Sequence, residues 1–305
     1  MNLRHVIESQ QFTVPLLLEL FDRTRRMEAV VARGGTKDYE RRIMATLFYR
    51  SSTRTRFSFE AAMHRLGGQV LSTENGNEFS SAVKGESLED TIRILGNYAD
   101  VIVLRHTEEG GAHRASLVSP VPVINAGEGE GGQHPTQALL DLYTIHRECK
   151  TLNGLSVALI GALDVGRTAR SLAYLLSKFE RVKFWFIAPP EMQVKPDILA
   201  YLDKYRVQYE LLSDPAKVLP TVDVVYQTRI DRERLQRRDI DLSVYNIDAN
   251  VLRALKPNAV IMHPLPRSVE IDPAVDADPR AVYFRQARNG LFVRMALLSI
   301  LFDRE

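Results

Sequence analysis

The chain alternates between short apolar runs and longer segments with apolar residues at helical spacing. Runs typical of buried strands occupy residues 43–48, 101–104, 121–124, 155–160, 183–187, 222–226 and 260–262. Helical spacing is found in residues 57–67, 133–145, 166–176 and 291–302. Such alternation of strand and helix predicts an α/β fold in which parallel sheets are covered by helices.

The length of the chain predicts two domains. It has 305 residues, and a single hydrophobic core stops growing at about 250–300 residues. The strand and helix pattern restarts after a polar run that ends at Lys150, so we place the domain division there. Ligands of open parallel sheets bind beyond the carboxyl ends of the strands, so the residues that follow each strand are the first candidates for function.

Charge and cysteine content narrow the class of protein. The 40 basic and 38 acidic side chains leave a net charge of +2, which gives no field to attract nucleic acid or an anionic membrane. The single cysteine, Cys149, cannot form an internal disulfide and fits a reducing compartment. It lies in a polar run without a nucleophile signature, so we expect no catalytic role for it. The first residues lack the apolar core of a signal peptide, and no run approaches the ~18 apolar residues of a membrane span. We therefore expect a cytoplasmic protein.

The densest cluster of candidate chemistry is SSTRTR at residues 51–56. It follows a predicted strand and opens a predicted helix, where unpaired backbone N–H groups point at an incoming anion. Hydroxyl and guanidinium donors add geometry suited to phosphate. A plain helix cap needs only one hydroxyl, so this density favours a phosphate site over a cap.

A second candidate region combines Arg105 with the segment GEGEGGQHPTQ at residues 127–137. Arg105 directly follows a predicted strand and would project over the same edge. Three glycines of the segment fit the G-x-G-x-x-G pattern of dinucleotide-binding proteins, which makes a nicotinamide-dependent oxidoreductase the alternative from another class. However, two glutamates place negative charge where a pyrophosphate would lie. We interpret the glycines as turn formers that present His134 and Gln137.

The second half of the chain offers Arg167, Arg229 and the segment HPLPR at residues 263–267. The two arginines follow strands, and each guanidinium can bind one carboxylate bidentately; unrelated surface arginines are the alternative. Prolines remove backbone donors and leave carbonyl groups as acceptors, for example for an NH2 group; a purely structural turn is equally consistent. The sequence contains no metal-ligand spacing, no triphosphate-binding loop and no serine elbow.

Taken together, these motifs resemble the aspartate/ornithine carbamoyltransferase family, and most closely its aspartate-specific catalytic chains. The resemblance extends from about residue 5 to residue 303. The motifs stand in the order of the family, as STRTR at 52–56, VKGE at 83–86, RH at 105–106, HPTQ at 134–137, GRT at 166–168, TR at 228–229 and HPLPR at 263–267.

The resemblance implies transfer of the carbamoyl group of carbamoyl phosphate to the amine of L-aspartate. The products would be N-carbamoyl-L-aspartate and phosphate, in pyrimidine biosynthesis, without a metal or organic cofactor. It implies a carbamoyl phosphate-binding domain of residues 1–150, joined by a C-terminal helix at 288–305. Residues 151–287 would bind the acceptor amino acid. The active site would lie between the domains and at a subunit interface of a homotrimer, and whether regulatory chains bind is left open.

The resemblance also assigns roles to individual residues. The phosphate would be bound by Ser52, Thr53, Arg54 and Thr55. The carbonyl oxygen would be polarised by Thr55, Arg105 and His134. The carbamoyl NH2 would be held by Gln137 and the backbone carbonyls of Leu265 and Pro266. The acceptor carboxylates would be bound by Arg167 and Arg229. Two residues would reach the site of a neighbouring subunit, Ser80 and Lys84. Those expected to act in catalysis are Arg54, Thr55, Lys84, Arg105 and His134.

The acceptor side departs from the pattern of the family. Residues 161–168 read GALDVGRT where aspartate-specific members have G-D-L-K-[YH]-G-R-T, so an acid is lost at Ala162 and a base becomes Asp164. Asp231 replaces a glutamine of the acceptor site, and its carboxylate would repel an anionic acceptor and attract an extra ammonium group. Arg50 stands where the family usually has an acid. Three interpretations remain, namely aspartate with altered affinity, a diamino acid as acceptor, or a weakly active or inactive paralogue with a structural or regulatory role.

Overall fold

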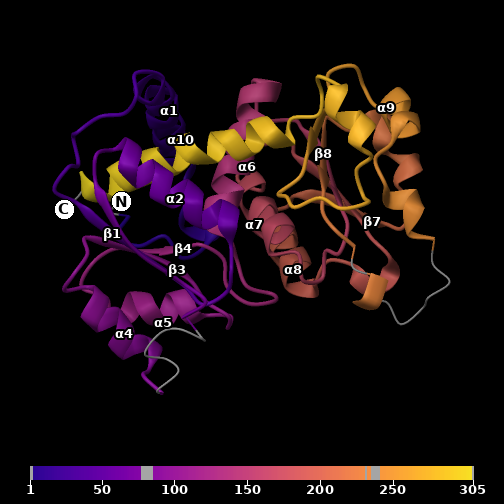
Figure 1. Cartoon of the computed structure of the whole chain (residues 1–305). Helices are drawn as coiled ribbons and strands as arrows, with labels where there is room; N and C mark the ends of the chain where they lie inside the picture. The colour runs from indigo at the N-terminus through magenta and orange to yellow at the C-terminus, as the bar shows by residue number, and fades with distance from the viewer. Residues whose placement is uncertain (1–2, 77–84, 231, 235–240, 304–305) are drawn as a thin grey trace. The chain divides into compact units, whose positions relative to one another are not determined.

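A computed structural model describes residues 3–76, 85–230, 232–234 and 241–303. Contacts within the chain divide it into two compact units. The first comprises Met1–Leu139 and Arg288–Glu305, and the second comprises Leu140–Ala287. Both chain ends therefore belong to the first unit (Figure 1). None of the described helices is long and apolar enough to cross a membrane.

The first unit contains a parallel four-stranded sheet in the order β2-β1-β3-β4. Its strands are β1 (Ile43–Phe48), β2 (Gln69–Glu74), β3 (Val101–Arg105) and β4 (Val123–Asn125). From β1 the chain moves to one edge, and from β3 it moves to the other. The carboxyl ends of β1 and β3 therefore flank a topological switch point, where open sheets of this kind bind ligands.

Helices cover both faces of this sheet. They are α1 (Val14–Ala32), α2 (Thr53–Arg65), α4 (Leu88–Leu95), α5 (Gly111–Val118) and the first part of α6 (Pro135–Cys149). Buried side chains of α4 and α5 pack against Leu47 of β1 and Leu104 of β3, while α2 lies on the opposite face (Figure 1). The last part of α10 (Tyr283–Phe302) completes the unit. There the buried Arg294 of α10 donates a hydrogen bond to Ser58 of α2 at 2.7 Å.

The second unit contains a parallel five-stranded sheet in the order β7-β6-β5-β8-β9. Its strands are β5 (Ser156–Ile160), β6 (Lys183–Ile187), β7 (Gln208–Leu212), β8 (Val224–Gln227) and β9 (Val260–Met262). Its α-helices besides α6 and α10 are α7 (Arg167–Leu176), α8 (Pro196–Lys204) and α9 (Ala249–Ala254). Here the switch point lies between β5 and β8, which is the edge that carries Arg167 and Arg229.

Short 3-10 helices complete the described secondary structure. They are η1 (Ser9–Gln11), η3 (Pro190–Met192), η4 (Pro215–Lys217), η5 (Leu219–Thr221), η6 (Arg232–Arg234), η7 (Leu242–Tyr245) and η8 (Pro273–Ala277).

The fold class predicted from the sequence is confirmed, since two parallel sheets are covered by helices. The strands at 43–48, 183–187 and 260–262 match the predicted bounds. The edge strands β2 and β7 were not predicted, because most of their residues are exposed or only half-buried and no apolar run marks them. The helix predicted at 291–302 begins earlier, at Tyr283. The prediction missed its first two turns because several of their residues are polar.

Candidate functional site

The SSTRTR segment lies between β1 and α2, and Ser52 is the residue that precedes the helix. Its side chain makes no capping hydrogen bond with the described residues, so a plain helix cap does not account for the motif. Thr53 and Arg54 are exposed, and Thr55 is buried. Partial burial lowers the pKa of the Arg54 guanidinium, which is still charged at neutral pH. The start of α2 thus combines hydroxyl groups, a helix N-terminus and a cation.

Glu74, at the end of β2, braces this loop. Its Oε1 atom accepts a hydrogen bond from the Ser52 backbone N–H at 2.9 Å. Its Oε2 atom lies 3.1 Å from Nη2 of Arg56. Ser51 also donates a hydrogen bond to Asn75 at 2.6 Å. Arg56 is therefore engaged in holding the loop, which leaves Arg54 as the guanidinium of the motif that an anion can meet.

Arg105 and His134 come together around Gly127. A Cβ atom placed on Gly127 would lie 3.0 Å from Nη1 of Arg105 and 3.1 Å from Cδ2 of His134. Gly127 has φ 104°, in the left-handed region that favours glycine. Arg105 also donates to the Ala126 carbonyl at 3.2 Å, and His134 is buried at the start of α6. Two donors expected at the carbonyl oxygen of carbamoyl phosphate thus converge on one point.

Both groups of residues lie at the same edge of the first sheet. Phe48 and Arg105 are paired at the ends of β1 and β3. The backbone N–H of Tyr49 then donates to the Arg105 carbonyl at 2.9 Å. The SSTRTR segment and Arg105 therefore leave neighbouring strands at the switch point.

The glycine loop packs against the chain itself. A Cβ atom on Gly129 would lie 2.6 Å from the Thr107 carbonyl oxygen, so this glycine allows a close backbone approach. Glu128 is buried and accepts a hydrogen bond from the Ala112 backbone N–H at 3.3 Å, at the start of α5. Burial raises the pKa of Glu128, and the backbone donors partly offset that effect. Gly129 and Glu128 thus contact the chain itself and not a pyrophosphate. This agrees with the interpretation of the glycines as turn formers.

In the second unit, the chain segments after β5 and β8 are joined. The Thr228 backbone N–H donates to the Ile160 carbonyl at 2.7 Å, and that of Ala162 donates to the Arg229 carbonyl at 3.1 Å. Gly161 has φ 132°, and a Cβ atom there would lie only 2.1 Å from Oγ1 of Thr228. This close approach places the GALDVGRT turn beside Arg229, and the same turn ends in Arg167 at the start of α7.

A pocket of about 370 Å³ lies beside Arg229 in the second unit. It is lined by Arg229, Ile230, Glu233, Arg234, Ser268, Val269 and Glu270. Arg234 forms an ion pair with Asp164, one of the residues that depart from the family pattern. The negative charge introduced by Asp164 is therefore matched within the chain, and the pocket lining combines the guanidinium groups of Arg229 and Arg234 with the carboxylates of Glu233 and Glu270.

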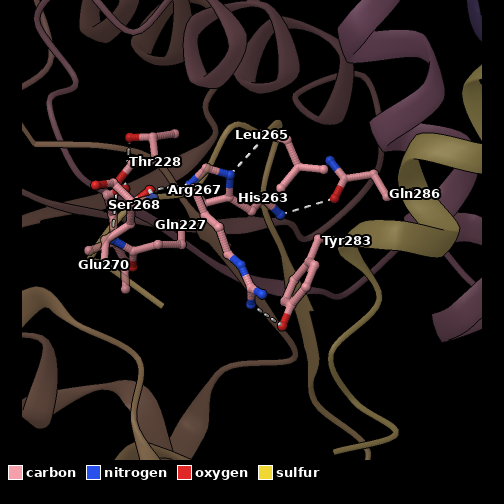
Figure 2. A network of polar contacts seen from close by, with 10 residues as sticks. Gln227, Thr228, His263, Leu265, Arg267, Ser268, Glu270, Tyr283 and Gln286 are labelled. Atoms are coloured by element: carbon pink, nitrogen blue, oxygen red, sulfur yellow. Dashed lines mark hydrogen bonds and ion pairs between the residues drawn. The ribbon is translucent and has the colours of Figure 1, made fainter. Parts of the chain in front are cut away.

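The HPLPR segment follows β9, beside β8, and Figure 2 shows its polar contacts. Leu265 has φ 57°, and the Leu265–Pro266 peptide bond is cis. Arg267 forms an ion pair with Asp276 and donates to the Tyr283 hydroxyl at 3.0 Å. The segment is thus fixed at its far end by Arg267.

Two further features of the described residues bear on the chemistry. Burial, followed by the charges of Asp223 and Glu148, raises the pKa of Cys149 to about 11, so its thiol stays protonated at neutral pH. No group of three or more side chains suited to a metal ion occurs in the described ranges.

Comparisons with known proteins match both units. Residues 4–147 match the family model described as "Aspartate/ornithine carbamoyltransferase, carbamoyl-P binding domain". Residues 153–301 match the model described as "Aspartate/ornithine carbamoyltransferase, Asp/Orn binding domain". The chain belongs to the aspartate/ornithine carbamoyltransferase family.

Individual members of this carbamoyltransferase family are similar over nearly the whole chain. A rice relative named "Aspartate carbamoyltransferase, chloroplastic" is 54% identical, over 99% of this chain and 85% of the relative. The solved catalytic subunit of M. jannaschii aspartate transcarbamoylase is 44% identical, with a TM-score of 0.91 and coverage of 98% of both chains. The Trypanosoma cruzi aspartate transcarbamoylase, solved with carbamoyl aspartate and phosphate, is 39% identical, with a TM-score of 0.89 over 97% of this chain and 95% of that one.

Most of the carbamoyltransferase residues expected from the sequence lie at the carboxyl edges of the two sheets. The first unit carries Ser52, Thr53, Arg54, Thr55, Arg105, His134 and Gln137, and the second carries Arg167, Arg229, Leu265 and Pro266. Three expected residues lie outside the described ranges, namely Ser80, Lys84 and Asp231.

Sequence reasoning missed the residues that support these groups. Glu74, Arg234 and Glu270 have no motif of their own, and each acts on a segment that is distant in sequence or separated by a turn. Gly127 was included in the glycine segment interpreted as a turn, but the close approach of Arg105 and His134 to it was not predicted.

Proposed function

We propose that this chain is an aspartate carbamoyltransferase, which converts carbamoyl phosphate and L-aspartate into N-carbamoyl-L-aspartate and phosphate, a step of pyrimidine biosynthesis. The observation that carries the proposal is a pair of complementary half-sites on one family member. One is the SSTRTR loop with Arg105 and His134 at the same sheet edge, and the other is the pocket beside Arg229, next to the turn that ends in Arg167. The relatives with 44–54% identity named above support aspartate as the acceptor.

The first half-site serves carbamoyl phosphate. The neutral amine of the acceptor attacks the carbamoyl carbon and the new C–N bond forms. The bond to the phosphate oxygen breaks with its electron pair on the departing phosphate, which takes up the proton that the amine loses. The carbonyl oxygen becomes negative in the transition state, where Thr55, Arg105 and His134 stabilise it. Preorganised donors of this kind contribute about 3–4 kcal/mol each. Arg54 and the start of α2 balance the charge of the departing phosphate.

The second half-site serves the acceptor. Arg167 and Arg229 bind the two carboxylates of aspartate, and their fork geometry fixes its orientation. The carbonyl groups of Leu265 and Pro266 accept hydrogen bonds from the carbamoyl NH2, with Gln137 as a further partner. Holding both reactants in a near-attack arrangement supplies much of the rate enhancement. The T. cruzi enzyme has also been solved with carbamoyl phosphate, which supports the same substrate here.

The ion pair between Asp164 and Arg234 bears on the choice of acceptor. Asp164 alone would repel an anionic acceptor, but its pairing with Arg234 removes most of that effect at short range. Aspartate therefore remains compatible with this departure from the family pattern. Asp231 is the residue that favours a diamino acid, because its carboxylate would attract a second ammonium group.

The assembly and compartment are further parts of the proposal. We propose a homotrimer in which Ser80 and Lys84 of one subunit act in the site of a neighbour, as the family resemblance implies. We also place the protein in the cytosol. The single cysteine supports a reducing compartment, while the rice relative is named chloroplastic.

The test is product formation by the purified protein with carbamoyl phosphate and separate amines, namely aspartate, ornithine and 2,3-diaminopropionate. We expect aspartate to exceed the others in kcat/KM by at least about 100-fold, since Arg167 and Arg229 together can bind the two carboxylates that only aspartate carries. The variant Asp231→Gln should then change kcat/KM for aspartate only modestly. Preferred turnover of a diamino acid, lost in Asp231→Gln, would identify that acceptor instead. No turnover with any amine would indicate an inactive paralogue.

A further inference from the structure

Leu265 adopts a backbone conformation that its surroundings must maintain. Its φ of 57° lies in the left-handed region, which a branched side chain rarely occupies. Strained residues of this kind persist only where neighbouring groups fix them, and they cluster at functional sites. The Leu265 backbone N–H donates a hydrogen bond of 2.8 Å to Nδ1 of His263. His263 therefore holds the peptide group that leads into Leu265.

This contact determines the tautomer of His263. A backbone N–H can only donate, so Nδ1 is the acceptor and the ring proton resides on Nε2. Nε2 lies 2.9 Å from Oε1 of Glu270 and donates to it. Both ring nitrogens are engaged and the side chain is only 2% exposed, so His263 is not placed to exchange protons with a substrate.

Glu270 closes the segment on itself. Besides His263, its carboxylate accepts from the Ser268 backbone N–H, at 3.0 Å to Oε1 and 3.1 Å to Oε2. Burial alone would raise the pKa of Glu270, but the hydrogen bonds from His263 and the backbone outweigh that effect and keep the pKa below its ordinary value. One ionised carboxylate thus joins the beginning of the Leu265 segment to its end.

The backbone of His263 is anchored on two helices. Its N–H donates to Oε1 of Gln286 in α10 at 3.0 Å (Figure 2). Gln286 donates in turn to Oδ1 of the fully buried Asp141 in α6 at 2.6 Å. The Tyr226 hydroxyl of β8 donates to the other oxygen of Asp141, also at 2.6 Å. The backbone of His263 is therefore held by Gln286, and its ring in turn holds the backbone N–H of Leu265.

We infer that His263 and Glu270 are positioning residues that direct the carbonyl groups of Leu265 and Pro266 at the carbamoyl NH2 group. This inference rests on the proposed function. A carbonyl acceptor orients an NH2 group only when its own direction is fixed, and a displacement of about 1 Å at a reacting group costs about 100-fold in rate. His263 thus acts through Leu265 and Pro266 rather than on the substrate itself, and Glu270, which also lines the pocket beside Arg229, holds the His263 ring in place.

Two substitutions of His263 separate its two hydrogen bonds. In His263→Asn, the side-chain oxygen occupies the place of Nδ1 and still accepts from Leu265. In His263→Gln, the side-chain amide occupies the place of Nε2 and still donates to Glu270, but nothing accepts from Leu265. We expect kcat to fall by about 100-fold in His263→Gln and by no more than about 10-fold in His263→Asn. The Kd for carbamoyl phosphate should be unchanged in both.

A matched carboxylate pair tests the role of Glu270. Glu270→Gln keeps the volume of the side chain and should lower kcat by about 10-fold, since the amide no longer attracts the His263 and Ser268 donors as strongly. Glu210→Gln is the control, because Glu210 is an exposed carboxylate on β7 that pairs with Lys183. Its kcat should equal that of the unsubstituted protein.

A readout independent of activity comes from the 15N NMR shifts of the His263 ring, which should report a protonated Nε2 and an unprotonated Nδ1. The opposite tautomer, or equal losses of kcat in His263→Asn and His263→Gln at equal melting temperatures, would overturn the inference and leave the proposed function intact. Absence of turnover by the unsubstituted protein would reject the proposed function, and the inference with it, before any variant is compared.

Discussion

At the scale of single residues, the proposed carbamoyl phosphate site depends on a glycine that has no side chain. Gly127 leaves room for Arg105 and His134 to approach the same point, and its φ of 104° suits glycine alone among common residues. A methyl group there would meet both side chains near 3 Å, closer than most carbon contacts in proteins. The geometry of the two donors therefore depends on the smallest residue nearby.

The substitution Gly127→Ala should lower kcat/KM by about 100-fold, because it displaces Arg105 and His134. It should also cost about 1–2 kcal/mol in free energy of unfolding, since alanine is strained at positive φ. Steady-state kinetics and urea denaturation measure the two effects.

Gly154→Ala is the matched control for this prediction. Gly154 also has a positive φ, of 73°, but no described heavy atom lies within 4 Å of its added Cβ. It should show a similar loss of stability with unchanged kinetics. Equal kinetic losses in both variants would show that strain, and not displacement of the donors, is responsible.

The sequence predicted candidate residues that belong to short local motifs. It did not predict residues that matter through contacts with parts of the chain far away in sequence. SSTRTR, HPTQ and HPLPR could be singled out because hydroxyl, cationic and proline residues gather beside expected strands. Gln286 and Asp141 contact each other across 145 residues, and no local pattern connects them. The roles of Ser80, Lys84 and Asp231 remain predictions, since these residues lie outside the described ranges.

At the scale of secondary structure elements, an edge strand supports the SSTRTR loop, which we propose binds the phosphate. β2 is one of the two edge strands of the first sheet, and Glu74 at its end contacts both Ser52 and Arg56. None of the residues of β2 is buried, so no apolar run predicted this strand. The central strands β1 and β3 were predicted, because they are buried on both faces and therefore form continuous apolar runs.

The substitution Glu74→Gln should raise the Kd for carbamoyl phosphate by about 10-fold. It removes the charge that pairs with Arg56 and weakens the hydrogen bond that fixes the Ser52 backbone. Stability should change by less than about 1 kcal/mol, because the ion pair is partly exposed. Isothermal titration calorimetry with carbamoyl phosphate measures the affinity. Glu40→Gln, which alters an exposed glutamate of the same unit, is the control. An unchanged Kd in Glu74→Gln would contradict a bracing role.

At the scale of the whole molecule, the proposed trimer makes a specific prediction about mixed assemblies. His134→Ala and Lys84→Ala should each be nearly inactive alone. In the proposed trimer, a site takes His134 from one subunit and Lys84 from its neighbour. After random mixing of equal amounts, each of these two positions is filled by the variant with the intact residue with a chance of one half. A complete site therefore forms with a chance of about one quarter.

Activity after reversible dissociation and mixing of the two variants should therefore recover to about one quarter of that of the unsubstituted protein. Each variant carried through the same procedure alone is the control. If light scattering shows that the mixture is trimeric but its activity does not recover, every site is built from a single chain.

The division of the chain inside α10 has a consequence for its synthesis on the ribosome. The second unit ends at Ala287, but the first unit also needs residues from Arg288 onward, including the buried Arg294 that binds Ser58. The domain translated first therefore lacks part of its interior until residues 288 onward have emerged, after every residue of the second unit has been made. The order in which the two cores are completed is thus the reverse of the order in which they are made.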